Sequence, residues 1–198
     1  MFARLSGEIV DIAGATATID VQGVGYEVHC TARCRERLQV GSKAVVTVFT
    51  AVREDEIKLY GFDDPTEKEV FLLLLRVSGI GAKTASEILS QVDKVELLRY
   101  IGAGDLTKLQ SMKGVGKKTA ERIVVELKDK VASYALERTP QTFQRNASGT
   151  DQEGEALLAL QALGFQRREA EVALGKAQAD NLSAASTADL VRSALRYL

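Results

Sequence analysis

Two short stretches of the chain combine glycine, lysine and threonine at the same spacing, a combination suited to binding phosphate. Residues 77–89 read VSGIGAKTASEIL, and residues 112–124 read MKGVGKKTAERIV. In both, two glycines bracket one apolar residue, and a helical pattern with lysine follows at once. Glycine lets the backbone approach a phosphate closely, and a helix start offers unpaired N–H groups and the positive end of the helix dipole. The sequence therefore predicts a repeated anion-binding turn.

Two common nucleotide-binding loops do not fit this repeat. A Walker A loop has four residues between its first glycine and the Gly-Lys-Ser/Thr unit, whereas Gly116 is followed by two lysines and Gly81 by Ala82. A dinucleotide-binding loop needs a third glycine three positions after Gly116, where Thr119 stands, and it follows a strand rather than a helix. The repeat therefore calls for a different ligand.

The order helix, glycine–apolar–glycine turn, helix resembles the helix-hairpin-helix DNA-binding motif. Ile80 and Val115 are expected to point inward and hold each turn to the core, while lysines in the first helical turn add charge-assisted contacts. Phosphate contacts carry no base information, so binding should be independent of sequence. One such turn alone also fits a helix–helix connection closed by a glycine C-cap. Two copies favour DNA binding, and a duplicated pair could hold both strands of a duplex across the minor groove. The expected DNA contacts are Gly79, Ile80, Gly81, Lys83, Gly114, Val115, Gly116, Lys117, Lys118 and Arg122.

The charge balance requires that DNA binding be local. The formal net charge is −1 and the pI is about 6.0, which argues against a protein that coats nucleic acid by bulk positive charge. Residues 63–150 carry 14 Lys and Arg against 12 Asp and Glu, whereas residues 1–62 carry 7 against 8 and residues 151–198 carry 5 against 7. Positive charge therefore gathers in the middle of the chain.

Cysteine use and hydropathy indicate a reducing cytoplasm. The only cysteines are Cys30 and Cys34, no apolar run is long enough to span a bilayer, and the first residues do not read as a signal peptide. A CxxxC pair with the lone His29 could indicate redox chemistry or half of a zinc site, but no second pair exists. The favoured interpretation is small apolar side chains near a strand end, and no cofactor or metal is expected.

Hydrophobic periodicity divides the chain into an α+β multidomain protein. Residues 1–62 alternate with a period of two over about five short strands, which predicts an oligonucleotide-binding (OB) barrel or an SH3-like barrel. Residues 63–136 are helical: Thr66 and Glu69 read as a capping box, Asp105 as the cap of a short helix, and a long helix follows Gly116. Its apolar face is expected at Ala120, Ile123, Val124, Leu127, Val131 and Tyr134.

The last part of the chain reads as a small module on a tether. Residues 137–154 are polar and aperiodic and predict a flexible linker, and residues 155–198 predict three short amphipathic helices. Such a short bundle is marginally stable and cannot bury its last apolar stripe, which therefore suits helix-in-groove docking to a partner. The expected partner-binding residues are Leu190, Val191, Ala194 and Leu195.

The sequence departs from the enzymes that share this motif. DNA glycosylases with this motif resemble one another in a catalytic Asp past a single hairpin, near position 138, but the residue there is Arg138. Asp129 is close in sequence, yet it lies between lysines, where a solvated ion pair is the ordinary explanation. Two alternatives nevertheless stay open: a lesion-processing glycosylase or nuclease, and an accessory module that brings another enzyme to duplex DNA.

The complete order of features resembles the RuvA family of Holliday-junction-binding proteins. The resemblance rests on VQGVGYEV (residues 21–28), VREDEIKLYGF (residues 52–62), GVGKKTAER (residues 114–122) and a linked, UBA-like helical module. It implies an OB barrel, a homotetramer or octamer that holds an open four-way junction, and the RuvB ATPase as the partner that hydrolyses ATP. It also implies the RuvC resolvase as a further partner, and a role in recombination, DNA repair and the SOS response.

The same resemblance gives a role to an acidic turn. Arg53-Glu54-Asp55-Glu56 joins two apolar strands, and on its own it reads as a solvated hairpin tip. In the family, Glu54 and Asp55 match an acidic pin that projects into the junction centre. Negative charge there would repel phosphates and disfavour reannealing. Glu56 is extra, or begins the next strand.

Overall fold

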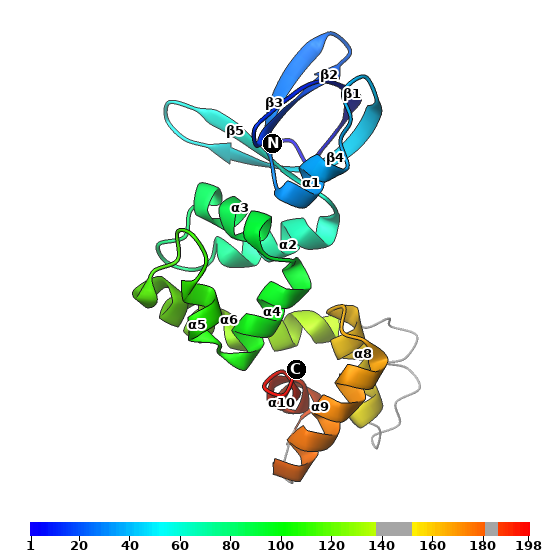
Figure 1. Ribbon diagram of the computed structural model, residues 1–198, viewed down its shortest axis with the longest axis vertical. Coiled ribbons are helices and arrows are strands. Elements are labelled where there is room, and N and C mark those ends of the chain that lie inside the picture. Colours follow the sequence, from blue (N-terminus) through cyan, green and yellow to red (C-terminus); the bar gives the residue numbers. More distant parts are fainter. Residues whose placement is uncertain (138–151, 181–185) are drawn as a thin grey trace. The chain divides into compact units, whose positions relative to one another are not determined.

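The computed structural model describes residues 1–137, 152–180 and 186–198, and these form two compact units (Figure 1). The first unit contains Met1–Lys94 and Met112–Gly114, and the second contains Val95–Ser111 and the rest of the described chain from Val115 to Leu198. No helix among the described residues is both long and apolar enough to cross a membrane.

The N-terminal part is a closed five-stranded barrel of the OB type. Its strands are β1 (Arg4–Ala13), β2 (Thr16–Val21), β3 (Val24–Cys30), β4 (Lys43–Val52) and β5 (Ile57–Phe62). They close in the order β1-β2-β3-β5-β4, in which β3 and β5 run parallel and every other pair is antiparallel. The short helix α1 (Ala32–Glu36) connects β3 to β4. This order confirms the OB prediction over the SH3-like alternative.

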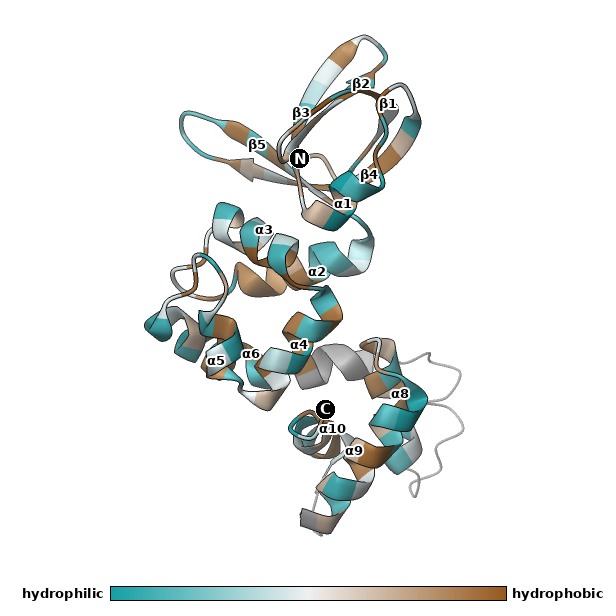
Figure 2. Ribbon diagram, in the orientation of Figure 1, coloured by the Kyte–Doolittle hydropathy of each residue, from teal (hydrophilic) through white to brown (hydrophobic). Residues whose placement is uncertain are grey.

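Alternating burial explains why these segments are strands. Apolar and polar residues are mixed along the strands in Figure 2, and burial alternates along β2 and β4. Ile9, Ile19 and Val28 belong to the barrel core and have no exposed surface. Gly7 permits β1 to lie close to β2, since a β-carbon there would lie 2.0 Å from the carbonyl oxygen of Asp20.

The two cysteines belong to the barrel core. Cys30 ends β3 and Cys34 lies in α1, and both are buried free thiols, as the apolar interpretation predicted. A hydrogen bond between the two side chains lowers the pKa of Cys30 and raises the pKa of Cys34. Within the described ranges no cluster of three His, Cys, Asp or Glu residues is placed to hold a metal ion.

Two helices complete the first unit, namely α2 (Pro65–Leu74) and α3 (Ala82–Gln91). The predicted capping box at Thr66 and Glu69 is wrong, because α2 begins earlier: the Asp64 side chain accepts the N–H of Glu67 at 2.8 Å, and Pro65 takes the first helical position. Only 1% of Glu67 is exposed, and its Oε2 accepts the hydroxyl of Thr31 at 3.0 Å and the N–H of Asp63 at 2.7 Å. This carboxyl group therefore ties α2 to the end of the barrel.

The helices α4 (Lys94–Ala103), α5 (Leu106–Gln110) and α6 (Lys117–Glu137) follow. Asp105 caps α5 as predicted, accepting the N–H of Lys108 at 3.0 Å. The predicted apolar face of α6 is confirmed at four positions with no exposed surface, and Val124 is half-buried. The Tyr134 side chain lies outside the described residues. The four fully buried positions are Ala120, Ile123, Leu127 and Val131.

Three helices form the C-terminal module: α8 (Gln152–Ala162), α9 (Arg167–Asp180) and α10 (Thr187–Ala194). The predicted linker falls mainly on residues 138–151, outside the described residues. At its two ends, Glu137 still belongs to α6, and residues 152–154 already belong to α8.

The expectation that the last apolar stripe of this module stays exposed for docking is wrong. Leu190 is 3% exposed, and Val191, Ala194 and Leu195 have no exposed surface. The helix α10 packs on α6 as well as on α8 and α9, and a β-carbon at Gly102 would lie 2.9 Å from Leu195 Cβ. The second unit therefore supplies apolar surface that a bundle of 44 residues lacks.

Candidate nucleic-acid interface

The first predicted hairpin joins α2 to α3 with the expected geometry. Gly79 has a φ of 91°, in the left-handed region that favours glycine. Ile80 is 6% exposed, and its N–H bonds the carbonyl of Val77 at 3.0 Å, so the inward orientation is confirmed. Gly81 is the N-cap of α3 and has no side chain to satisfy the first helical amides.

The second hairpin, between α5 and α6, repeats this geometry. Gly114 has a φ of 89°, and Val115 is 5% exposed. The N–H of Ala120 is bonded to the carbonyl of Gly116 at 2.9 Å, as the N–H of Ala85 is bonded to that of Gly81 in the first hairpin. The two copies therefore share a backbone conformation as well as a sequence pattern.

The two glycines of a hairpin have different physical roles. The first glycine has a positive φ, which residues with a side chain rarely adopt. The second glycine has no such conformation, and a β-carbon at Gly81 or Gly116 would meet nothing within 4 Å. The absence of a side chain at the second position therefore leaves open space before the helix N-terminus, where a phosphate can approach the amides.

The predicted cationic side chains lie on the exposed sides of these helix starts. Lys83 is exposed in the first turn of α3, and Lys117 and Lys118 are exposed in the first turn of α6. Arg122 is exposed about one turn further along α6. Each hairpin thus joins free backbone N–H groups to positive side chains at one helix end, which suits a phosphate group.

A glutamine that the sequence pattern did not single out holds the approach to the second hairpin. The Gln91 side chain accepts the N–H of Lys113 at 2.7 Å and donates to the carbonyl of Lys113 at 3.4 Å. A β-carbon at Gly114 would lie 3.4 Å from Thr84 Cγ2, so residues 112–114 lie against α3. A lone glutamine at a helix end carries no motif, and only the fold reveals its partner.

The acidic turn lies at the tip of the β4–β5 hairpin. Glu54 and Asp55 are exposed, and neither has a hydrogen bond or ion pair within the described part of the chain. Glu56 differs, because its carboxylate pairs with Lys58 Nζ at 2.6 Å and lies 3.8 Å from Arg53 Nη1. Two uncompensated negative charges therefore remain at the tip.

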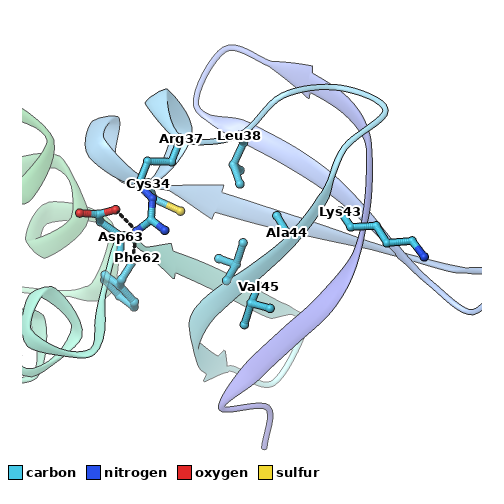
Figure 3. Close-up of a pocket in the computed structure, with 9 residues that line it drawn as sticks. Cys34, Arg37, Leu38, Lys43, Ala44, Val45, Phe62 and Asp63 are labelled. Carbon is cyan, nitrogen blue, oxygen red and sulfur yellow. Dashed lines mark hydrogen bonds and ion pairs between the residues drawn. The ribbon is translucent and has the colours of Figure 1, made fainter.

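A cavity of about 250 Å³ beside α1 has a structural lining (Figure 3). Arg37 donates to the backbone carbonyl and to the carboxylate of Asp63, at 2.8 and 2.5 Å, which ties the end of α1 to the β5–α2 connection. Lys43 extends away from this pair in Figure 3. We assign this cavity no role in DNA binding, because Arg37 is already paired with Asp63 and Lys43 extends away from the pair (Figure 3).

An OB barrel followed by paired glycine hairpins with lysine-bearing helix starts defines a helix-hairpin-helix DNA-binding protein. Models of three domain families match the chain in the same order. They are the RuvA N terminal domain over residues 1–61, the SAM-like Helix-hairpin-helix tandem over residues 71–129 and the RuvA C-terminal domain over residues 151–198.

The chain belongs to the RuvA family. It is 38% identical over 203 residues to the "Holliday junction branch migration complex subunit RuvA" of Rhodopseudomonas palustris strain BisB18, covering 100% of this chain and 99% of that protein. The protein of the same name from Alkaliphilus oremlandii is 38% identical over 198 residues, with 100% and 99% covered. That from Bacteroides fragilis strain YCH46 is 39% identical over 169 residues, with 83% and 84% covered.

Proposed function

We propose that this chain binds four-way DNA junctions independently of sequence, as a non-catalytic subunit of a branch-migration complex in recombination and DNA repair. The observation that carries the proposal is the repeated hairpin, with φ values of 91° at Gly79 and 89° at Gly114 and an open second glycine in each copy. The names of the relatives supply the kind of DNA. The protein acts in the cytoplasm without a cofactor.

Each hairpin binds the phosphates of a junction arm. The amides at the start of α3 and α6 donate to phosphate oxygens, and Lys83, Lys117 and Lys118 add positive charge. Arg122 reaches a neighbouring phosphate from the next helical turn. Because none of these contacts reads a base edge, affinity should depend on the shape of the junction and the salt concentration rather than on arm sequence.

The tip of the β4–β5 hairpin gives selectivity for the junction. Glu54 and Asp55 carry charges that no described residue compensates, and such charges repel the closely spaced phosphates of a continuous duplex. In a four-fold homotetramer, four copies of the tip would meet where the strands exchange. Repulsion there keeps the strands apart and holds the junction open. A second tetramer on the opposite face would make an octamer.

The partner that hydrolyses ATP is the RuvB ATPase, and the RuvC resolvase is a further partner. Residues 155–198 contact RuvB in this proposal. The predicted docking residues Leu190, Val191, Ala194 and Leu195 are buried where α10 packs on α8, α9 and α6, so their use requires α10 to leave these contacts. RuvB then competes with the neighbouring helices of the second unit for the apolar face of α10.

A competition gel tests the proposal directly. Purified full-length chain is titrated against a labelled four-way junction in the presence of unlabelled linear duplex with arms of the same total length. We expect the junction to be retained against an excess of duplex, with the same result when the arm sequences are exchanged. Equal competition by linear duplex would instead indicate a general accessory module, and turnover of damaged or branched DNA by the chain alone would indicate an enzyme.

A further inference from the structure

We propose that a groove between the barrel and α3, which adjoins the first hairpin and shares Lys83 with it, binds one nucleotide of a single DNA strand. The groove lies wholly within the first unit, between β3, β5, α3 and residues 112–114, and its volume is about 460 Å³. This size is within the range of about 300–1,000 Å³ typical of small-ligand sites, which suits a nucleotide and excludes a duplex. The inference rests on the proposed function, because it needs DNA whose strands are separated.

Lysines from three elements line the groove. Lys58 comes from β5, Lys83 from the first turn of α3, and Lys113 from the loop before the second hairpin. Lys58 Nζ forms an ion pair with the Glu56 carboxylate at 2.6 Å. Within the described ranges, Lys83 and Lys113 have no ion-pair partner. With Glu87 as the acidic residue of the lining, the groove has an excess of positive charge. An anionic ligand follows from this excess.

The backbone of Lys113, a lysine that the sequence pattern did not predict as a DNA contact, is held in place. The Gln91 side chain makes two hydrogen bonds to the backbone of Lys113, at 2.7 and 3.4 Å. Because the backbone is fixed, the Lys113 side chain starts from one position at the edge of the groove. Less conformational freedom is then lost when it binds a phosphate.

Aromatic rings form another part of the lining, and they favour a nucleotide over inorganic phosphate. The rings of His29 and Tyr60 lie with centroids 5.7 Å apart at an interplanar angle of 36°. Tyr60 also packs on Phe71, with a centroid distance of 5.8 Å, so its ring is fixed from behind. His29 is the more accessible ring, with 33% of its side chain exposed. Tyr60 is only 7% exposed and supports His29 from the interior, so an unpaired base of any identity can stack on the His29 ring.

The position of the groove favours a strand over a free nucleotide. Lys58 and Tyr60 lie in β5, the strand that directly follows the turn with Glu54 and Asp55. The tip of this hairpin repels phosphates, and the lysines at its base attract them. At the other side, Lys83 belongs to the first hairpin, so the groove continues the phosphate path of a bound duplex arm. A strand separated by the tip therefore has a charged path to the groove.

The test uses full-length chain and a fluorescent oligothymidylate of about 20 nucleotides, long enough for a single-strand site. The variant Lys58→Gln/Lys113→Gln removes two groove charges, while Lys43→Gln/Lys68→Gln removes two lysine charges of the same unit outside it. We expect the groove variant to bind oligothymidylate about tenfold more weakly. The slope of log affinity against log salt should fall by about 0.7, because Lys113 loses an uncompensated charge whereas Lys58 is already paired with Glu56. The control variant should match the wild type in both measurements.

Three results would contradict the proposal that the groove binds a nucleotide. They are unchanged oligothymidylate binding by the groove variant, an equal loss in the control variant, or no binding by the wild type. Displacement by thymidine monophosphate at the same nucleotide concentration would show a free-nucleotide site and overturn the strand assignment. Matching thermal unfolding curves exclude misfolding. The junction competition of the wild type does not involve these variants, so failure of the groove and failure of junction binding are distinguishable.

Discussion

Lys117 and Lys118 both occupy the first turn of α6, beside free backbone amides. Replacing both with Ala should weaken junction binding by about 1–3 kcal/mol, because charge-assisted phosphate contacts are lost. The salt dependence should become less steep by about one unit for each lost contact. Junction titrations at two salt concentrations measure both effects. The exposed lysine Lys43 supplies the control, and an affinity equal to wild type at both salts would refute the hairpin assignment.

Glu54 and Asp55 should act in the opposite direction. The variant Glu54→Gln/Asp55→Asn removes the uncompensated charges of the tip and keeps similar side-chain shapes. We expect linear duplex to bind more tightly, so that the ratio of junction to duplex affinity decreases. Parallel titrations with both DNAs give this ratio. Glu56→Gln is the matched control, since Glu56 is already paired with Lys58. If the double variant keeps the wild-type ratio, the tip is only a solvated turn and has no role in selectivity.

Glu67 should make stability depend on pH. Burial raises the pKa of Glu67, although hydrogen bonds from the Asp63 N–H and the Thr31 hydroxyl oppose the shift. Because the folded-state pKa is above the ordinary carboxyl value, this group's stabilising contribution is fully present below that value. It is lost as the pH rises through the raised pKa. Glu67→Gln keeps an acceptor and removes the charge, so its free energy of unfolding should fall less than that of the wild type across this window.

Urea unfolding at a series of pH values measures the effect of Glu67. The variant Glu67→Ala is the useful contrast, because it leaves the Thr31 hydroxyl and the Asp63 N–H without their acceptor at every pH. It should lose about 1–3 kcal/mol throughout. Identical pH profiles for wild type and Glu67→Gln would show that this carboxyl group does not titrate differently in the folded state.

At the level of the hairpin element, substitution of the first glycine should lower stability, whereas substitution of the second should lower junction affinity. Gly114→Ala forces a side chain into a left-handed conformation, at a φ of 89°, and should destabilise the fold by about 1–2 kcal/mol. Gly116→Ala meets open space, so stability should be kept while the methyl group blocks phosphate approach and junction affinity falls. Unfolding curves and junction titrations of both variants separate the two effects.

The first hairpin provides an internal repeat of that experiment. Gly79 has a φ of 91° and corresponds to Gly114, whereas Gly81 corresponds to Gly116. If Gly116→Ala and Gly81→Ala both bound junctions like the wild type, close backbone approach to phosphate would not be the reason for the second glycine.

At the level of the whole molecule, junction binding and motor recruitment should be separable. A chain ending near residue 150 lacks α8, α9 and α10 but keeps the barrel and every predicted DNA contact. We expect it to bind a four-way junction with near wild-type affinity, and to lose both RuvB recruitment and ATP-driven branch migration. Junction titration, RuvB co-sedimentation and a branch-migration assay measure the three properties.

The control for this truncation concerns folding, because the C-terminal module covers part of α4 and α6. Leu195 lies against Gly102, and Arg192 pairs with Asp129 at 2.8 Å, so the truncation exposes apolar surface. Urea unfolding establishes that the shortened chain is folded before binding is compared. Loss of junction binding by a folded truncation, or full RuvB stimulation without the module, would contradict the proposal that the C-terminal module recruits RuvB but does not bind the junction.

Features encoded by neighbouring residues were predictable from the sequence. The period-two alternation of residues 1–62 predicted the strands of the barrel, and the spacing of Gly79-Ile80-Gly81 and Gly114-Val115-Gly116 predicted both hairpins with their buried apolar residue. Asp105 was recognised as a cap because its acceptor lies three residues from the N–H that it satisfies. Strand alternation, turn geometry and helix capping each depend on a few adjacent residues, so one sequence carries them.

Long-range contacts were decided only by the tertiary structure. The parallel pairing of β3 with β5 closes the barrel, and it brings Lys58 to the groove that Lys113 and α3 complete. The apolar stripe of α10 was visible in the sequence, but its cover on α4 and α6 was not, and the inference that it stays exposed was wrong. Periodicity shows which face of a helix must be buried. The surface that buries it comes from residues far away in the chain, and their position is set by the packing of the whole unit.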